Sequence, residues 1–148
     1  MQKIIFFFSI FFFFQDLFSK EEYFLTLKNE KVNLGQGPSF DYPVKIFYKK
    51  KFLPVLIQDS SDNFRKIRDH ENNTGWVHIS QLSKKKAAIV IDDEIILFSN
   101  STVYSNPIAV LKKGRLVRIK KIKDDWCKIE TGNFKGWIEK ESLWGLLK

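Results

Sequence analysis

Two stretches of this chain repeat one pattern: Phe64-Arg65-Lys66-Ile67 followed by Gly75-Trp76-Val77, and Trp126-Cys127-Lys128-Ile129 followed by Gly136-Trp137-Ile138. In each copy an aromatic residue, a lysine and an isoleucine precede a polar turn, and a Gly-Trp pair follows the turn. A leucine then closes each copy six residues after the tryptophan. Because several spacings are kept together, we interpret the chain as a tandem of one small module.

The repeat extends upstream of both copies. Val55 and Ile57 precede Phe64 at the same intervals at which Val117 and Ile119 precede Trp126. Short β-branched and aromatic runs, separated by turn residues at intervals of about ten, are typical of an all-β barrel or sandwich. The sequence therefore predicts an all-β fold of two tandem small barrels behind an N-terminal signal segment.

The first nineteen residues have the order of a secretory signal peptide. Lys3 precedes an apolar run over 4–14, which is shorter than the roughly 20 residues that cross a bilayer. We expect residues 1–19 to be a signal peptide. An uncleaved anchor is the alternative, because Leu17-Phe18-Ser19 is a poor cleavage signal. Both readings predict an exported protein of the periplasm or cell envelope, with no membrane span after the signal segment.

The rest of the chain divides into two predicted domains, residues 20–83 and 84–148. A unit near 60 residues buries only about 60% of its extended-chain surface, so each domain is marginally stable alone. We therefore expect the two domains to pack against each other. Lys84-Lys85-Lys86 marks the join and lacks the Gly, Pro and Ser of a flexible linker, which predicts little hinge freedom.

The chain of 148 residues carries a formal charge of +8. The excess lies in scattered lysine runs, such as 49–51, 84–86 and 112–113. Such runs form either a solvated surface or a site for a polyanion. The predicted export argues against nucleic acid as the partner.

No residue set has the pattern of a catalytic or metal centre. Cys127 is the single cysteine, and its strand position predicts a side chain in the core, away from any activating histidine such as His70. The histidines and carboxylates show no ligand spacing such as His-x-x-x-His. We expect no catalytic residue, no metal and no cofactor.

Alternation along each hairpin assigns the two faces of the strands. Ile67, Ile129 and Cys127 are predicted to point into the core, and Phe64 and Trp126 toward the rim. Turn residues dominate the stretch 32–39, which is predicted to be a turn-rich segment. Only 139–147 is compatible with a short helix or 3₁₀ turn.

These residues resemble the bacterial SH3-like (SH3b) domain family, and most closely exported proteins with two such domains. The opening Val32-Asn33-Leu34-Gly35-Gln36-Gly37-Pro38-Ser39 is similar to the family pattern Leu-Asn-Val-Arg-x-Gly-Pro-Ser. The two hairpins described above are similar to the family's central hairpin. The resemblance implies two tandem SH3-like barrels that bind cell-wall peptides or protein segments.

The chain departs from the family pattern in three places. Gly35 stands at the position of the family's arginine, Phe64 stands where tryptophan is usual, and the second opening is reduced to Leu97-Phe98-Ser99-Asn100-Ser101. The missing arginine weakens the expectation of an anionic ligand at the first site. The reduced opening indicates that the second module serves chiefly as support.

We expect a non-enzymatic, exported SH3-like binding protein that recognises peptidoglycan stem peptides or an extended partner peptide. Two alternatives stay open: a scaffold protein that docks a partner subunit, and electrostatic attachment to anionic envelope polymers. Trp76 has either of two roles, core filling or an aromatic floor for the ligand. The oligomeric state stays open. The candidate ligand-binding residues are Asn33, Gly37, Pro38, Tyr42, Phe64 and Trp76.

Overall fold

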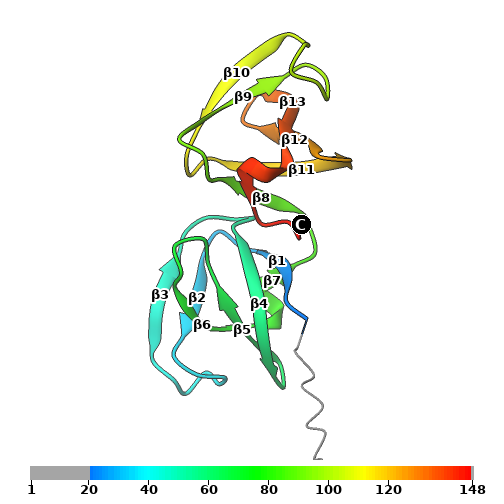
Figure 1. Ribbon diagram of the computed structural model, residues 1–148. Coiled ribbons are helices and arrows are strands. Elements are labelled where there is room, and N and C mark those ends of the chain that lie inside the picture. Colours follow the sequence, from blue (N-terminus) through cyan, green and yellow to red (C-terminus); the bar gives the residue numbers. More distant parts are fainter. Residues whose placement is uncertain (1–20, 148) are drawn as a thin grey trace, which may run out of the picture.

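The computed structural model describes residues 21–147 and consists almost entirely of antiparallel strands. The strands form two seven-stranded sheets, one for each half of the chain, which lie one above the other in Figure 1. This confirms the predicted all-β fold of two tandem units. The predicted signal segment, residues 1–19, lies outside the described residues. Within 21–147, no helix has the length and apolar character needed to cross a membrane.

The first module runs from β1 to β7, with strand order β3-β2-β6-β5-β4-β1-β7. A single 3₁₀ turn, η1 (Ile79–Gln81), precedes its last strand. The strands are β1 (Tyr23–Leu27), β2 (Val32–Gly35), β3 (Val44–Tyr48), β4 (Pro54–Ser61), β5 (Phe64–Arg68), β6 (Thr74–His78) and β7 (Leu82–Ser83).

The second module repeats this order as β10-β9-β13-β12-β11-β8-β14. Its 3₁₀ turn, η2 (Lys140–Ser142), agrees with the short helical turn predicted within 139–147. The strands are β8 (Ala87–Val90), β9 (Glu94–Phe98), β10 (Pro107–Lys112), β11 (Leu116–Lys123), β12 (Trp126–Thr131), β13 (Phe134–Glu139) and β14 (Leu143–Trp144).

The central hairpin has the same register in both modules. Ile67 lies opposite Gly75 in the first module, and Ile129 lies opposite Gly136 in the second. Both isoleucines and Cys127 are fully buried, whereas Phe64 at the start of β5 and Trp126 at the start of β12 are only half-buried. The prediction of which residues face the core is therefore confirmed for these positions.

The prediction for residues 32–39 was wrong in its first half. Val32–Gly35 is the strand β2, and only the residues after Gly35 form the turn. Val32 and Leu34 are buried while Asn33 is exposed, which is the alternation of a half-buried strand. Pairing with β3 on one side and with β6 at Gly35–Trp76 overrides the local turn preference of asparagine and glycine.

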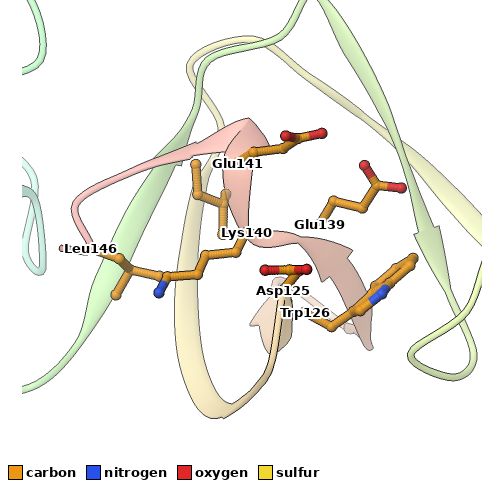
Figure 2. Close-up of a pocket in the computed structure, with 7 residues that line it drawn as sticks. Asp125, Trp126, Glu139, Lys140, Glu141 and Leu146 are labelled. Carbon is orange, nitrogen blue, oxygen red and sulfur yellow. The ribbon is translucent and has the colours of Figure 1, made fainter. Parts of the chain in front are cut away.

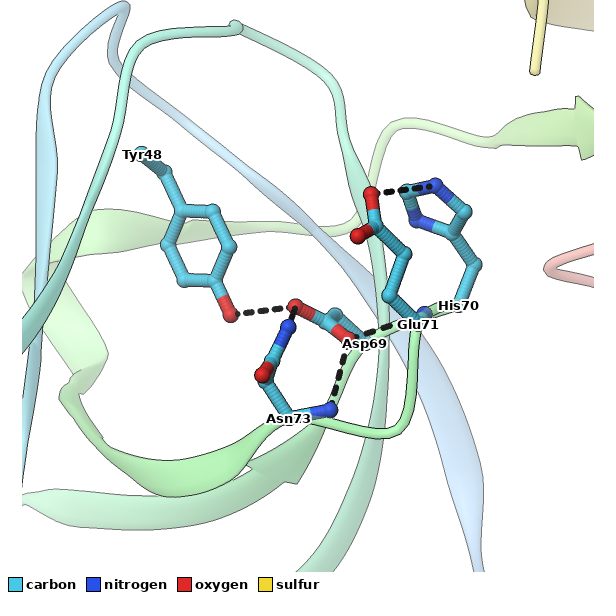
Figure 3. Close-up of polar contacts among 5 residues, drawn as sticks. All are labelled: Tyr48, Asp69, His70, Glu71 and Asn73. Atoms are coloured by element: carbon cyan, nitrogen blue, oxygen red, sulfur yellow. Dashed lines mark hydrogen bonds and ion pairs between the residues drawn. The ribbon is translucent and has the colours of Figure 1, made fainter.

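A buried polar network holds the loop between β5 and β6. Asp69, which is only 3% exposed, accepts hydrogen bonds from the Tyr48 hydroxyl at 2.8 Å and from the Asn73 side chain at 3.0 Å. Its other oxygen accepts the backbone N–H groups of Glu71 and Asn73, both at 2.9 Å. Figure 3 shows these donors converging on the one carboxylate. Because the buried oxygens are satisfied, Asp69 fixes the loop to β3 at little desolvation cost.

The two modules share apolar packing where they meet. Ile89 of β8 is buried in the same cluster as Leu27, Leu53 and Val55 of the first module. Trp144 of β14 packs edge-on against Phe24 of β1, with ring centroids 4.9 Å apart. The expected packing of one module against the other is therefore confirmed, because Ile89 and Trp144 of the second module contact apolar residues of the first.

Candidate ligand-binding groove

A groove of about 430 Å³ lies on the first module between the β2–β3 loop and the β5–β6 hairpin. Its lining combines aromatic side chains with a few polar groups, which is the usual composition of a peptide or small-molecule site. The lining residues are Lys31, Asn33, Gly35, Ser39, Phe40, Tyr42, Val44, Phe64, Trp76, His78 and Gln81.

Three of the rings that line the groove form a compact cluster. Phe40 stacks on His78 with centroids 5.2 Å apart, and it meets Phe64 edge-on at 5.1 Å. Phe64 and His78 are themselves edge-on at 5.2 Å. Phe40 is 80% exposed even though it takes part in this cluster. A large aromatic surface is therefore open to solvent and already held in place by two neighbouring rings.

Four of the six predicted site residues line this groove, namely Asn33, Tyr42, Phe64 and Trp76. They come from four segments of the chain: β2, the β2–β3 loop, β5 and β6. The fold thus brings together residues that the sequence places far apart. Whether they bind a ligand stays a prediction.

Gly37 and Pro38, the other two predicted residues, lie in the loop and are not among the lining residues. Gly37 has a structural role there, because a Cβ atom at this position would lie 2.5 Å from the ring of Tyr42. The absent side chain lets the Tyr42 ring lie directly on the loop backbone. Hydrogen bonds from Gln36 N to Pro43 O at 3.0 Å and from Asp41 N to Ser39 Oγ at 3.0 Å stabilise the loop in this form.

Trp76 occupies its place because Gly75 precedes it. A Cβ atom on Gly75 would lie 2.6 Å from Leu34 Cγ and 2.8 Å from Gly35 O, so only glycine allows β2 to approach β6 this closely. Trp76 is neither fully buried nor fully exposed, and it lines the groove. Of its two predicted roles, the floor of a groove fits this placement better than core filling.

The prediction from the sequence missed two aromatic residues of the groove, Phe40 and His78. His78 lies two residues after Trp76 on the same strand, so alternation alone places both on one face. Phe40 lies two residues after Pro38 in a loop, where no periodicity indicates its direction. The His78 Nδ1 atom accepts the Ser80 N–H at 3.2 Å, which leaves Nε2 to carry the proton of the neutral ring.

The groove has a neutral to positive lining. Among the described residues that line it, none is a carboxylate, whereas Lys31 and His78 supply nitrogen donors. The ammonium group of Lys31 also lies 5.6 Å from the ring centroid of Phe47. A peptide that bears carboxylates therefore meets complementary charge here, even though Gly35 replaces the arginine of the family pattern.

A family model described as the bacterial SH3 domain matches this chain twice, over residues 28–84 and 93–145. The chain belongs to this family. The two modules are therefore the first and second SH3 domains of the chain. Comparison with curated proteins found no match.

Two solved structures matched by this chain are those of NlpC2 and NlpC1 from Trichomonas vaginalis, each 14% identical to it. The NlpC2 match covers 84% of this chain and 48% of the other, with a TM-score of 0.38. The NlpC1 match covers 83% and 45%, with a TM-score of 0.37. The chain thus spans about half the length of these proteins.

The second SH3 domain differs at the position that corresponds to the groove. Trp137 pairs across the sheet with Phe98, whereas Trp76 pairs with Gly35. The Phe98 ring packs edge-on against Trp126 with centroids 5.8 Å apart. A bulky side chain thus occupies the place where the first domain has glycine beside its tryptophan. That the second domain serves chiefly as support stays a prediction.

The second SH3 domain has a hollow of its own, about 510 Å³ in volume, beside η2. Figure 2 shows the carboxylates of Asp125, Glu139 and Glu141 around it, together with the indole of Trp126. Glu139 follows Trp137 by two residues, as His78 follows Trp76 in the first domain. The hollow of the second domain has three carboxylates and one lysine, Lys140, in its lining, so its net charge is negative, whereas no carboxylate lines the groove of the first domain.

Cys127 is fully buried in the core of the second SH3 domain. Burial raises the pKa of its thiol, so the group stays protonated and shielded at neutral pH. Within the described part of the chain, no cluster of three or more histidine, cysteine or acidic side chains has the arrangement of a metal site.

Proposed function

We propose that this chain is a non-enzymatic, exported binding protein whose first SH3 domain recognises a peptidoglycan stem peptide. The observation that carries this proposal is the groove between the β2–β3 loop and the β5–β6 hairpin, with its aromatic surface formed by Phe40, Phe64 and Trp76. Membership of a family of binding domains supports the same role. Export and a place in the periplasm or cell envelope are part of the proposal and rest on the sequence of residues 1–19.

The shape and charge of the groove suit an extended peptide that carries carboxylates. The aromatic rings give contact area with few rotatable bonds, so an extended chain is bound at low entropic cost. The donors on Lys31 and Asn33 lie along the same groove and are available to carboxylate and backbone oxygens. The single thiol is buried, which agrees with binding rather than nucleophilic catalysis.

The test is sedimentation of the purified protein with peptidoglycan sacculi. Phe40→Ala should weaken this binding about tenfold, which is typical of removing a large aromatic side chain from an interface. The matched control is Tyr104→Ala, which removes a 95% exposed aromatic ring from the corresponding loop of the second SH3 domain. It should sediment like the unchanged protein. A folded Trp76→Ala protein that still sediments fully would exclude the groove.

A second candidate function is docking of a partner protein on an open strand edge. β10 ends its sheet, and its outer face carries Ile108 and Val110, which are 42% and 55% exposed. Ile96 of β9 lies opposite Val110 and is also exposed. An edge strand with an apolar face can accept an added strand from a partner. Co-purification of one stoichiometric protein, without sedimentation on sacculi, favours this function.

A further inference from the structure

Three cationic side chains gather around one phenylalanine ring where the two SH3 domains meet. The guanidinium carbon of Arg118 lies 4.2 Å from the ring centroid of Phe52, and the ammonium groups of Lys51 and Lys85 lie 5.1 and 5.8 Å from it. Lys51 and Phe52 belong to the first domain, Lys85 to the join, and Arg118 to β11 of the second domain. Both domains are therefore needed to form this cation cluster.

The cation cluster lacks the carboxylates that usually neutralise such a group. Within residues 21–147, the side chains of Lys51, Lys85 and Arg118 form no ion pair, and the buried Nε atom of Arg118 has no hydrogen-bond partner. Glu130 is the carboxylate that lines the adjoining hollow, and it already pairs with Lys120 and Lys135, each at 3.3 Å. The three like charges therefore repel one another, and a bound anion would relieve that repulsion.

The backbone at the centre of the cation cluster is strained. Phe52 has a φ of 65°, in the left-handed region that bulky residues rarely adopt. A hydrogen bond from its N–H to Leu27 O at 2.9 Å holds it in place. Strain of this kind concentrates at ligand-binding sites, where it fixes a side chain in a functional position. Here it holds the ring within cation–π distance of Lys51, Lys85 and Arg118.

Beside Phe52 lies an open hollow of about 360 Å³, whose lining includes Arg118, Thr131 and Gly132. Arg115 contacts two of these lining residues and therefore borders the hollow. Its Nε donates a hydrogen bond to Thr131 Oγ1 at 2.7 Å, and its Nη2 atom is 3.1 Å from the point where a Cβ atom on Gly132 would lie. The hollow therefore has room for a ligand of several atoms, with Arg118 in its lining and Arg115 at its border, while its one carboxylate, Glu130, is already paired with two lysines.

We propose that the cation cluster at the junction of the two SH3 domains binds a linear polyanion through its phosphate groups. A phosphate group presents several charged oxygens at once, so it can contact an arginine fork and a lysine ammonium together. This site is separate from the peptide groove and does not depend on it. Because both domains supply the cations, the bound anion also stabilises their packing against each other.

The test uses the full chain and tripolyphosphate as the probe, by isothermal titration calorimetry at physiological salt. Under these conditions the Debye length is about 8 Å, so a diffuse attraction to the basic surface is largely screened. The K51Q/K85Q double variant should bind at least about tenfold more weakly than the unchanged protein, since it loses two charge-assisted contacts. The melting temperature of the unchanged protein should rise with tripolyphosphate, and that of the variant should not.

The matched control is K123Q/K128Q, which also removes two positive charges. Lys123 lies at the far end of β11 and Lys128 in β12, and both are exposed. Its affinity should stay within about twofold of that of the unchanged protein, because these lysines do not contact Phe52. An equal loss in both double variants would overturn the proposal, as would the absence of binding by the unchanged protein. Phe40→Ala should bind tripolyphosphate normally, which separates this site from the groove.

Discussion

Gly75→Ala is the substitution whose effect the structure defines best. The added methyl would lie 2.8 Å from the carbonyl oxygen of Gly35 and 2.6 Å from Leu34 Cγ. A backbone oxygen within a sheet has little freedom to move, so β2 must shift away from β6. Overpacking of this kind costs about 1–3 kcal/mol, and the reduced entropy of the unfolded chain offsets about 0.4–1 kcal/mol of it. We expect a net loss of about 1–2 kcal/mol.

Two other glycines supply the controls for urea unfolding followed by tryptophan fluorescence. A Cβ on Gly35 meets its nearest atoms at 3.5 and 3.6 Å, so Gly35→Ala should leave stability unchanged or raise it by less than about 1 kcal/mol. Gly136→Ala has the same clash in the second SH3 domain, with Phe98 O at 2.5 Å. It should lose stability as Gly75→Ala does but keep its binding to sacculi. A Gly75→Ala protein as stable as Gly35→Ala would refute the reasoning.

Three further substitutions test the loop network, the domain junction and the buried thiol. Burial raises the pKa of Tyr48 well above its ordinary value of about 10, and the hydrogen bond to Asp69 raises it further. The unfolded chain therefore loses the hydroxyl proton at a lower pH than the folded protein, and the free energy of unfolding falls as pH rises above about 10. Tyr48→Phe should lower the free energy of unfolding by about 1 kcal/mol at pH 7 and should reduce the loss of stability above pH 10. Urea unfolding at pH 7 and above pH 10 checks this, and a variant whose stability falls with pH as steeply as that of the unchanged protein would contradict it. Trp144→Ala removes the contact with Phe24 and should lower the free energy of unfolding by about 2 kcal/mol. In calorimetry the two domains of this variant should melt in separate transitions, and one sharp transition would count against a shared core. Cys127→Ser should cost about 1–3 kcal/mol, and the native thiol should react with a thiol reagent only at the rate of unfolding; rapid native labelling would show that it is accessible.

The repeated hairpin was predictable because its residues obey a local rule. Ile67 and Ile129 alternate with polar neighbours, and alternation on a strand determines which side chain is buried. β2 was not predictable in the same way, since Asn33 and Gly35 locally favour a turn. The strand exists because β3 and β6 pair with it, and such partners become visible only in the folded chain.

The candidate groove was predictable where the family pattern marks residues, and not elsewhere. Asn33, Phe64 and Trp76 belong to recognisable motifs, Tyr42 was a candidate aromatic residue outside them, and the structure brings the four together. Phe40 sits in a loop held by hydrogen bonds among its neighbours, so nothing periodic in the sequence indicates the direction of its ring.

The cation cluster was unpredictable for a different reason. Phe52 and Arg118 lie in different halves of the chain, and only the packing of the two SH3 domains brings them together. The lysine runs predict a positively charged surface, but they do not predict that cationic side chains gather around Phe52. That gathering depends on the left-handed backbone of Phe52, which no local preference of phenylalanine predicts.

The position of Ile89 bears on how such a repeat can evolve. This residue is encoded in the second half of the chain, yet its side chain fills space in the interior of the first half, beside Leu27 and Val55. Deletion of either half by recombination would leave the surviving half with an unfilled or exposed apolar surface. Loss of either copy would therefore destabilise the other, so selection for stability favours keeping the two together.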